Sequence, residues 1–413
     1  MKIILETLHH QINSIPKKDA RSKIVPLELV AALLCSVQKD SGRRSISNIR
    51  RQVIALTGKK ISRSSFWERL ATLRLKNFLF SLLGQLSANI AEVCSVGPEL
   101  LKKLGVSGIF ILDSSSVSLP KDASKEFPAP RNNVVPAAIK WHALFDLLGG
   151  GLTWFDLTEA TTHDRKRFPP LELLPAKALL IFDLGYWDYL LLQELIKSGF
   201  YFLSRVKTNA KIQIKEVISG TSKKYVGKNL MSCRFPAQAR NVVDVMGMFQ
   251  KSGKELFTCR IVGFWNPVEQ HYHWYATNLA IVARAIYPLY RLRWQCELIF
   301  KACKSSMNFS SITTSDSKII VNLVLLGILH CLLASVLGGH LASKLQLEKQ
   351  MSMSVQRCAI IFVQSSGDLF RFILDISCLK LLREKLKLLK SELFDPNFRS
   401  RKSSLAQAYE ALV

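Results

Sequence analysis

Two short apolar runs that each end at an aspartate restrict the fold of this chain more than any other feature. Ser107–Leu112 (SGIFIL) precedes Asp113, and Ala178–Phe182 (ALLIF) precedes Asp183. Runs of this length and composition are typical of buried strands. Because ligands gather at the carboxyl ends of strands in open sheets, both aspartates are candidates for one shared site. Either aspartate alone is explained equally well by a turn or a helix cap.

A basic segment further along the chain supplies a third carboxylate. Four of its polar residues are Tyr290, Arg293, Glu297 and Lys304. On a helix that turns about 100° per residue, these four residues fall, in that order, at roughly 0°, 300°, 340° and 320° around the axis. They share one narrow stripe, whereas a solvated face with casual ion pairs, which is the alternative, would be broader.

The residue types on the two strands and the helix suit phosphoryl transfer. Mg²⁺ prefers oxygen ligands, and two such ions can hold both the attacking and the leaving oxygen of a phosphoryl displacement. Arg293 and Lys304 are suited to hold phosphates, and arginine can do so with two hydrogen bonds. We therefore expect Asp113, Asp183 and Glu297 to form a two-metal site.

The charge balance indicates a polyanionic partner. The 413 residues contain 57 Lys and Arg against 31 Asp and Glu, a net charge of +26. An ordinary metabolic enzyme acting on a small molecule does not need this excess, so nucleic acid is the first expectation and an anionic membrane the second. A hydrophobic content of 48% excludes a disordered chain. Nine scattered cysteines without a CxxC pair disfavour a zinc ribbon and suit a reducing cytosol, and no secretory signal is apparent.

The first 105 residues are expected to form a basic helical region. Ser45–Leu56 and Ser62–Leu75 each begin at a serine suited to cap a helix, and Thr57–Gly58 separates them. This arrangement resembles a helix-turn-helix, although a plain helical bundle would look similar. The candidate DNA contacts in this region are Arg50, Arg51 and Arg63.

The rest of the chain divides into regions that differ in their pattern of apolar and polar residues. Lys140–Leu147 and Leu152–Leu157 predict a hairpin, and Trp187–Ser198 predicts a helix. The expected regions are 1–105, helical and basic; 106–198, the first part of a sheet core; 199–280, mostly strands; 281–393, the second part of the core with helices; and 394–413, a polar basic tail that is partly disordered. The strands expected in 199–280 are Phe200–Val206, Lys211–Val217, Glu255–Phe264 and His271–Thr277.

One apolar segment, residues 319–337, is about as long as a bilayer span. It contains Asn322 and His330, and a single such span in a strongly basic chain is more often a buried core helix. We favour the core helix and expect no membrane association.

The stripe and the two aspartates resemble a known family. Tyr290, Arg293, Glu297 and Lys304 match the Tyr-x2-Arg-x3-Glu-x6-Lys (YREK) signature of DDE-type transposases of the insertion-sequence-4 family. Asp113 and Asp183 are similar to the first and second catalytic aspartates of that family, the second in a D-x-G-Y context. The resemblance covers roughly residues 107–310.

The resemblance implies an RNase H-like fold, which is a mixed sheet with helices on both faces, interrupted by a mostly β insertion before the glutamate helix. It implies cut-and-paste DNA transposition with Mg²⁺ or Mn²⁺. In that reaction water nicks one strand at the element end, and the freed 3′-OH then joins target DNA. The segment 319–337 would pack against the sheet, and the N-terminal helices would bind terminal inverted repeats. A homodimer on DNA, in the bacterial cytoplasm and at the nucleoid, would follow.

The resemblance also implies roles for individual residues. Asp113 would bridge both metals, and Tyr290 would contact a phosphate or a flipped base instead of acting as a nucleophile. An aromatic side chain from the insertion stacks on a flipped base in some relatives, which makes Trp265 and Trp274 candidates, with core packing as the alternative. Lys140 and His142 are candidates for DNA contact or for flanking the site.

Three further alternatives stay open. A decayed transposase would bind DNA without cutting it, and a nuclease of the same fold would cut without joining. A membrane-associated basic protein built on 319–337 is the third. His271 and His273 should share one face of a strand, but without a visible third ligand they do not indicate a metal site.

Overall fold

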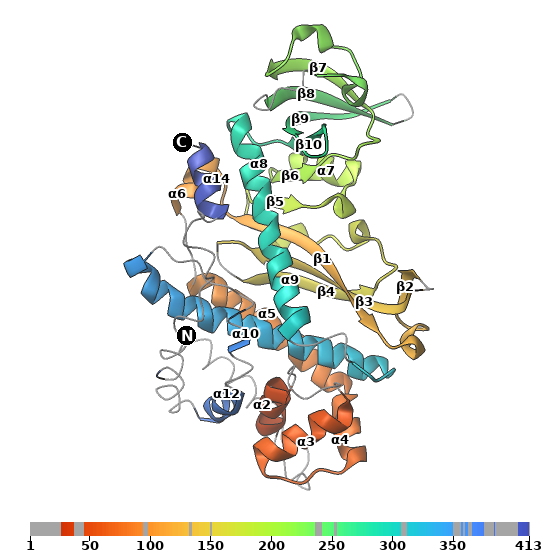
Figure 1. Ribbon diagram of the computed structural model, residues 1–413, viewed down its shortest axis with the longest axis vertical. Helices are drawn as coiled ribbons and strands as arrows, with labels where there is room; N and C mark the ends of the chain where they lie inside the picture. Colours follow the sequence, from red (N-terminus) through yellow and green to blue (C-terminus); the bar gives the residue numbers. More distant parts are fainter. Residues whose placement is uncertain are drawn as a thin grey trace.

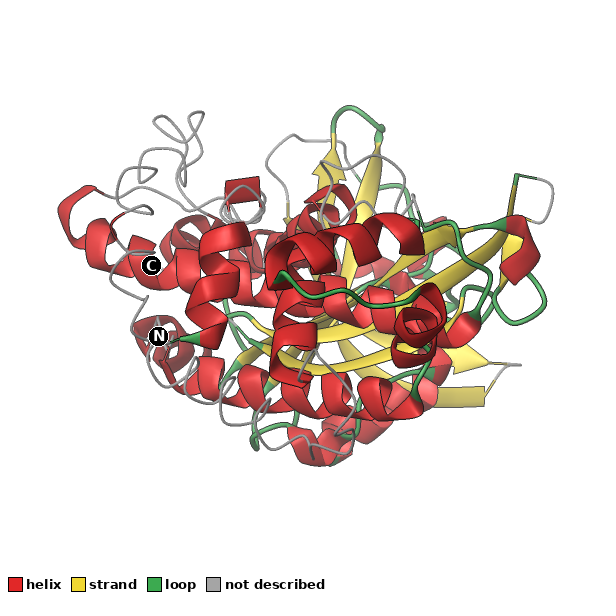
Figure 2. Cartoon of the chain, turned by 90° about the horizontal axis from the view of Figure 1, so that it is seen from below, coloured by secondary structure: helices red, strands yellow, loops and turns green. Residues whose placement is uncertain are grey.

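The computed structural model describes residues 26–36, 45–93, 98–131, 134–148, 151–235, 242–251, 254–306, 312–349, 366–375 and 404–412, with a few isolated positions between these ranges. A large mixed sheet crosses the molecule, with helices along it and below it (Figure 1). Seen from below, the helices gather in front of the strands (Figure 2).

The sheet has ten strands in the order β2-β3-β1-β5-β6-β10-β9-β8-β7, with β4 pairing to β3. Strands β1, β5 and β6 are parallel neighbours, and the remaining ladders are antiparallel. The strands are β1 (Ile109–Leu119), β2 (Pro128–Arg131), β3 (Val135–Asp146), β4 (Leu152–Glu159), β5 (Leu179–Phe182), β6 (Tyr201–Arg205), β7 (Ile212–Ser219), β8 (Val242–Lys251), β9 (Lys254–Asn266) and β10 (His271–Thr277).

Side chains of β1 alternate between two hydrophobic clusters, one on each face of the sheet. Ile109 and Ile111 join the cluster that contains the large helices, whereas Phe110 and Leu112 join the cluster that contains Leu192 of helix α7 (Tyr189–Lys197). Since successive strand residues point to opposite faces, a continuous apolar run is what a strand buried on both sides requires. The expected mixed α/β sheet with helices on both faces is therefore present.

The helices are α2 (Pro26–Ser36), α3 (Ile46–Thr57), α4 (Arg63–Leu70), α5 (Leu73–Val93), α6 (Pro98–Leu104), α7 (Tyr189–Lys197), α8 (Ile286–Tyr290), α9 (Trp294–Ser306), α10 (Ser317–Lys349), α12 (Ser366–Leu374) and α14 (Ser404–Leu412). The serine caps are confirmed, because the side chains of Ser45 and Ser62 accept backbone N–H groups at the starts of α3 and α4. Helix α4 ends at Leu70, so the expectation of one helix through Leu75 is wrong, and α5 begins at Leu73 instead.

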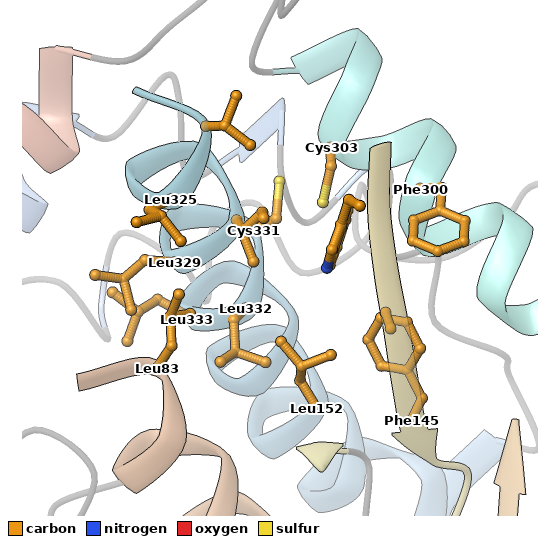
Figure 3. Close-up of a cluster of buried hydrophobic side chains, with 14 of the residues drawn as sticks. Leu83, Phe145, Leu152, Phe300, Cys303, Leu325, Leu329, Cys331, Leu332 and Leu333 are labelled. Atoms are coloured by element: carbon orange, nitrogen blue, oxygen red, sulfur yellow. The ribbon is translucent and has the colours of Figure 1, made fainter. Parts of the chain in front are cut away.

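The apolar segment 319–337 lies in helix α10, whose neighbours are α5, α2, α9 and α4. The resemblance placed it against the sheet, and it shares one hydrophobic cluster with Ile109 and Ile111 of β1 as well as with the neighbouring helices. Figure 3 shows Leu329 and Leu332 in a cluster with Leu83 of α5, Leu152 of β4 and Phe300 of α9. Asn322 is buried and donates to the carbonyl oxygen of Leu70 at 2.7 Å, which ties α10 to the end of α4. In the part of the chain that the structure describes, no helix is long and apolar enough to cross a membrane.

Two regions differ from the expected pattern. Strand β8 was not expected, and it pairs with β7 and β9. The end of the expected tail forms helix α14, which packs on α8 and bonds to α6 through Tyr409 Oη and Glu99 Oε2 at 3.1 Å (Figure 1). The four strands expected between 199 and 280 are confirmed as β6, β7, β9 and β10, and the helix expected at Trp187–Ser198 is α7.

Candidate active site

A cleft of about 600 Å³ opens where β1, β5 and α9 meet. Its lining carries three carboxylates, three cations, two hydroxyls and one phenyl ring. The lining residues are Asp113, Ser114, Ser115, Asp183, Arg293, Glu297, Phe300, Lys301 and Lys304. The three acids expected to lie together therefore line one cleft, although Asp113 and Glu297 are 184 positions apart in the sequence.

The ladder between β1 and β5 places the two aspartates side by side. Leu112 pairs with Phe182 in a parallel register, so the next position on each strand is Asp113 and Asp183. Strand β5 ends at Phe182, and Asp183 caps a short 3₁₀ helix by accepting the N–H of Leu184. The sequence left capping and a place in the site as alternatives for Asp183, and in the structure Asp183 both caps a helix and lines the cleft.

Asp113 does not end its strand, and that expectation is wrong. Strand β1 continues to Leu119 because β3 pairs with it on the other side, with Asp113 opposite Ala143. Since β5 stops after four residues, the second half of β1 extends past it and leaves the edge open beside Asp113. The open edge gives the cleft its floor.

Helix α9 places Glu297 and Lys304 over this edge, and Arg293 precedes it in a 3₁₀ turn (Arg291–Arg293). Arg293 Nη1 donates to Asp113 Oδ2 at 2.6 Å, and Arg293 Nη2 donates to Glu297 Oε1. The guanidinium therefore bridges the first and third acids. Its Nε atom is buried and has no hydrogen-bond partner among the described residues, so this arrangement leaves one donor unsatisfied.

Asp113 is only 8% exposed. Burial raises the pKa of Asp113 to about 6, Arg293 acts to lower it, and the charges of Asp183 and Glu297 raise it further. A carboxylate in this position is costly to ionise unless a cation lies nearby. The site consequently favours cation binding at the point where the acids converge.

Tyr290 lies behind Arg293 instead of lining the cleft. Its ring centre is 4.9 Å from that of Tyr275 and 5.9 Å from the guanidinium carbon of Arg293. Burial raises the pKa of Tyr290 to about 12. In this structure Tyr290 is in contact with Arg293, while Arg293, Glu297 and Lys304 face the cleft.

Lys140 and His142 belong to a polar network on β3 beside the cleft. Lys140 Nζ donates to Asp164 Oδ1 at 3.1 Å and to the carbonyl oxygen of Thr162 at 2.7 Å. His142 is fully buried, with Nδ1 3.3 Å from Tyr186 Oη, and burial lowers its pKa to about 4. The structure thus places both residues flanking the site, and His142 does not reach solvent.

Asp164 connects this network to the first catalytic candidate. Ser114 Oγ donates to Asp164 Oδ1 at 2.9 Å, and the N–H of Ser114 donates to Asp113 Oδ1 at 2.8 Å. Gly185 also lies against Asp164, since a Cβ there would fall 2.4 Å from Asp164 Oδ2. The glycine of the D-x-G-Y context therefore makes room for this carboxylate.

The remaining candidates lie outside the cleft. Trp265 is half-buried against Tyr272, and the ring of Trp274 stacks on that of Tyr272 at 5.3 Å. Arg51 and Arg63 are exposed on α3 and α4. Arg50 is partly buried and donates to the carbonyl oxygen of Ile61 at 2.7 Å, which joins α3 to the turn that precedes α4.

Comparison with known proteins assigns the family. The family described as "Transposase DDE domain" matches residues 105–333, which is more than half of the chain. The chain belongs to this family.

Insertion-sequence transposases are among its relatives. The chain is 27% identical over 242 residues to the transposase for insertion sequence element IS1151 of Clostridium perfringens, covering 49% of this chain and 51% of the relative. It is 24% identical over 293 residues to the transposase for IS231F of Bacillus thuringiensis subsp. israelensis, covering 61% and 60%. The chain therefore spans about half to three fifths of the length of these relatives.

The cleft and its surroundings contain residues that sequence reasoning missed. Lys301 lines the cleft but stands outside the YREK spacing, and Ser114, Asp164 and Tyr186 form the support behind Asp113. The D-x-G-Y motif contains Tyr186 and was a usable signal for it. Asp164 had none, because a loop aspartate beside basic residues is common on any surface.

Proposed function

We propose that this protein catalyses cut-and-paste transposition of an insertion sequence. Water nicks one DNA strand at the element end, and the released 3′-OH attacks a phosphodiester of target DNA. One observation supports this above all: two neighbouring parallel strands, one helix and the 3₁₀ turn before it bring three carboxylates and three cations into a single cleft. The names of the relatives, transposases for insertion sequence elements, agree with this proposal.

The acids of the cleft fit a divalent metal. Asp113, Asp183 and Glu297 offer only oxygen ligands, which Mg²⁺ prefers and Mn²⁺ accepts, and the Arg293 guanidinium already stands between two of them as a cation would. A bound metal pair would activate water for the attack and would neutralise charge on the phosphate. We propose that Asp113 would help to hold both ions and that Asp183 and Glu297 would each help to hold one.

The cations of the cleft are proposed to position the DNA backbone. Arg293 presents a planar fork suited to a phosphate, and Lys301 and Lys304 follow it on the same side of α9. The buried ring of Tyr290 supports the guanidinium from behind. Phosphates entering the cleft compete with Asp113 and Glu297 for Arg293, so this arginine changes partners when DNA binds.

The proposed domain division follows the same function. Residues 1–105 bind DNA, residues 106–198 and 281–393 form the catalytic core, 199–280 are a β insertion, and 394–413 are a tail. The insertion joins the core through β6, which forms a parallel ladder with β5. Two element ends must be held together, so we propose a homodimer on the terminal inverted repeats, acting at the nucleoid in the cytoplasm.

The exposed arginines of α3 and α4 allow a test of DNA binding. We expect Arg51→Ala and Arg63→Ala each to weaken binding to a duplex carrying the element end. Each change should reduce the slope of log K against log [salt] by about 1 if one phosphate contact is lost. Fluorescence anisotropy over a salt series measures this slope. Lys197→Ala, an exposed cation on α7, is the matched control, and an equal loss with this variant would contradict a specific role for α3 and α4.

Removal of the metal tests the catalytic proposal directly. Purified protein should nick a labelled duplex that carries the element end in Mg²⁺ or Mn²⁺, and EDTA should abolish nicking while binding persists. The same reaction, supplied with target DNA, should yield joined products. Binding without nicking in any metal would indicate the alternative of a DNA-binding protein derived from a transposase, and nicking without joining would indicate a nuclease.

A further inference from the structure

Three potential metal ligands converge at the turn between β9 and β10. Glu269 Oε2 lies 3.2 Å from His271 Nε2 and 2.5 Å from His273 Nε2. The three ligand atoms all lie within 4.8 Å of one another, and no other described residues form such a group. None of the three residues lines the acidic cleft. Glu269 is the third ligand that the spaced histidine pair lacked in the sequence.

The turn brings Glu269 back over the strand. Asn266 Oδ1 accepts the N–H groups of Val268 and Glu269 at 3.0 and 3.3 Å, and Gln270 adopts the left-handed region with a φ of 55°. His271 and His273 are two residues apart on β10, so both point to one face of the sheet. The cluster is therefore built by the hairpin itself.

The hydrogen bonds of His271 direct a lone pair at Glu269. His271 Nδ1 is 3.0 Å from the carbonyl oxygen of Glu269, and a carbonyl oxygen only accepts, so Nδ1 carries the hydrogen. A neutral His271 then presents an unprotonated Nε2 to the carboxylate oxygen. Metal-ligating histidines commonly have their other nitrogen held in this way by a backbone carbonyl.

His273 makes the closest contact of the cluster. Its Nε2 atom lies 2.5 Å from Glu269 Oε2 and 3.4 Å from the amide nitrogen of Asn266. When Nε2 carries a hydrogen, it donates that hydrogen to the carboxylate; without the hydrogen, Nε2 offers a lone pair beside the carboxylate oxygen. One divalent cation between the three ligand atoms can therefore take the place of the imidazole hydrogens.

We infer that Glu269, His271 and His273 form a site for a divalent transition metal of the zinc type. Two imidazole nitrogens and one carboxylate oxygen suit Zn²⁺, with water in the fourth position, whereas Mg²⁺ favours oxygen ligands alone. The ion joins the turn to the strand and stabilises the tip of the hairpin. It is separate from the metals proposed for Asp113, Asp183 and Glu297.

Zinc titration of the full chain tests the inference. Calorimetry in excess Mg²⁺, which occupies the oxygen site, should show Zn²⁺ binding that weakens at least about tenfold in His273→Gln and in Glu269→Gln, since each loses one ligand. His163→Gln, which changes one exposed histidine in a different loop, is the matched control and should bind as the wild type does. Zn²⁺ should also raise the melting temperature of the wild type more than that of either variant.

The variants separate a metal site from a purely ionic cluster. Glu269 lies on an exposed turn, so Glu269→Gln should fold even if His273→Gln does not. Zn²⁺ binding that is equal in the wild type and in both variants would overturn the inference, as would a wild type that binds no Zn²⁺. In either case the three side chains form an ion-pair cluster of protonated histidines with Glu269.

Discussion

Asp113→Asn is expected to slow strand cleavage by about 10³-fold or more while leaving duplex binding nearly unchanged. The exchange keeps the shape of the side chain but removes the charge that Arg293 contacts and that interacts with Asp183. Loss of a metal-binding carboxylate removes several kcal/mol of transition-state stabilisation, and each 1.36 kcal/mol corresponds to a factor of ten in rate. Single-turnover cleavage of the labelled element end, with anisotropy for binding, measures both quantities.

The matched control is Asp122→Asn, because Asp122 is exposed and outside the cleft. It should cleave at the wild-type rate. Glu297→Gln should behave like Asp113→Asn, since both acids bind the same guanidinium. If Asp113→Asn cleaved DNA at the same rate as Asp122→Asn, the assignment of Asp113 to catalysis would be wrong.

Asp244→Ala is expected to lower the free energy of unfolding by about 3–5 kcal/mol, because it leaves a buried arginine without its counter-ion. Asp244 on β8 holds Arg260 of β9 through two hydrogen bonds of 2.9 and 2.7 Å, and its side chain is 3% exposed. Arg260 also donates to the carbonyl oxygens of Leu279 and Ile281. These carbonyls lie just before helix α8, so the pair anchors the segment that leads to Arg293 and Glu297.

Denaturant unfolding followed by circular dichroism measures the loss. Glu216→Ala removes an exposed carboxylate from β7 in the same part of the sheet and should change the unfolding free energy by less than about 0.5 kcal/mol. The double variant Asp244→Leu/Arg260→Met should recover much of the lost stability, since both charges are then absent. A single variant as stable as Glu216→Ala would show that the pair does not anchor this segment.

Local patterns predicted most helices and strands, because burial of an element leaves a recognisable pattern of apolar residues in its sequence. The runs before Asp113 and Asp183 are continuous and apolar, as strands covered on both faces must be, and they form β1 and β5. Strand β8 was not predicted from the sequence, because Asp244 interrupts its apolar face. That aspartate is compatible with burial only because Arg260, diagonally across from it on β9, pairs with its charge, and no local pattern records such a partner.

The sequence by itself determined the three acids, their order along the chain and the spacing that sets Glu297 and Lys304 on one side of a helix. These features depend on residue identity and on the period of a single element. The expected continuation of that helix back through Arg293 to Tyr290 is interrupted by a 3₁₀ turn. Only the tertiary structure decided that Arg293 bridges Asp113 and Glu297, that Asp164 supports Ser114, and that Glu269 meets two histidines. Contacts of this kind depend on ladder register and on where the chain turns back, because side chains far apart in sequence meet only when several elements pack at once.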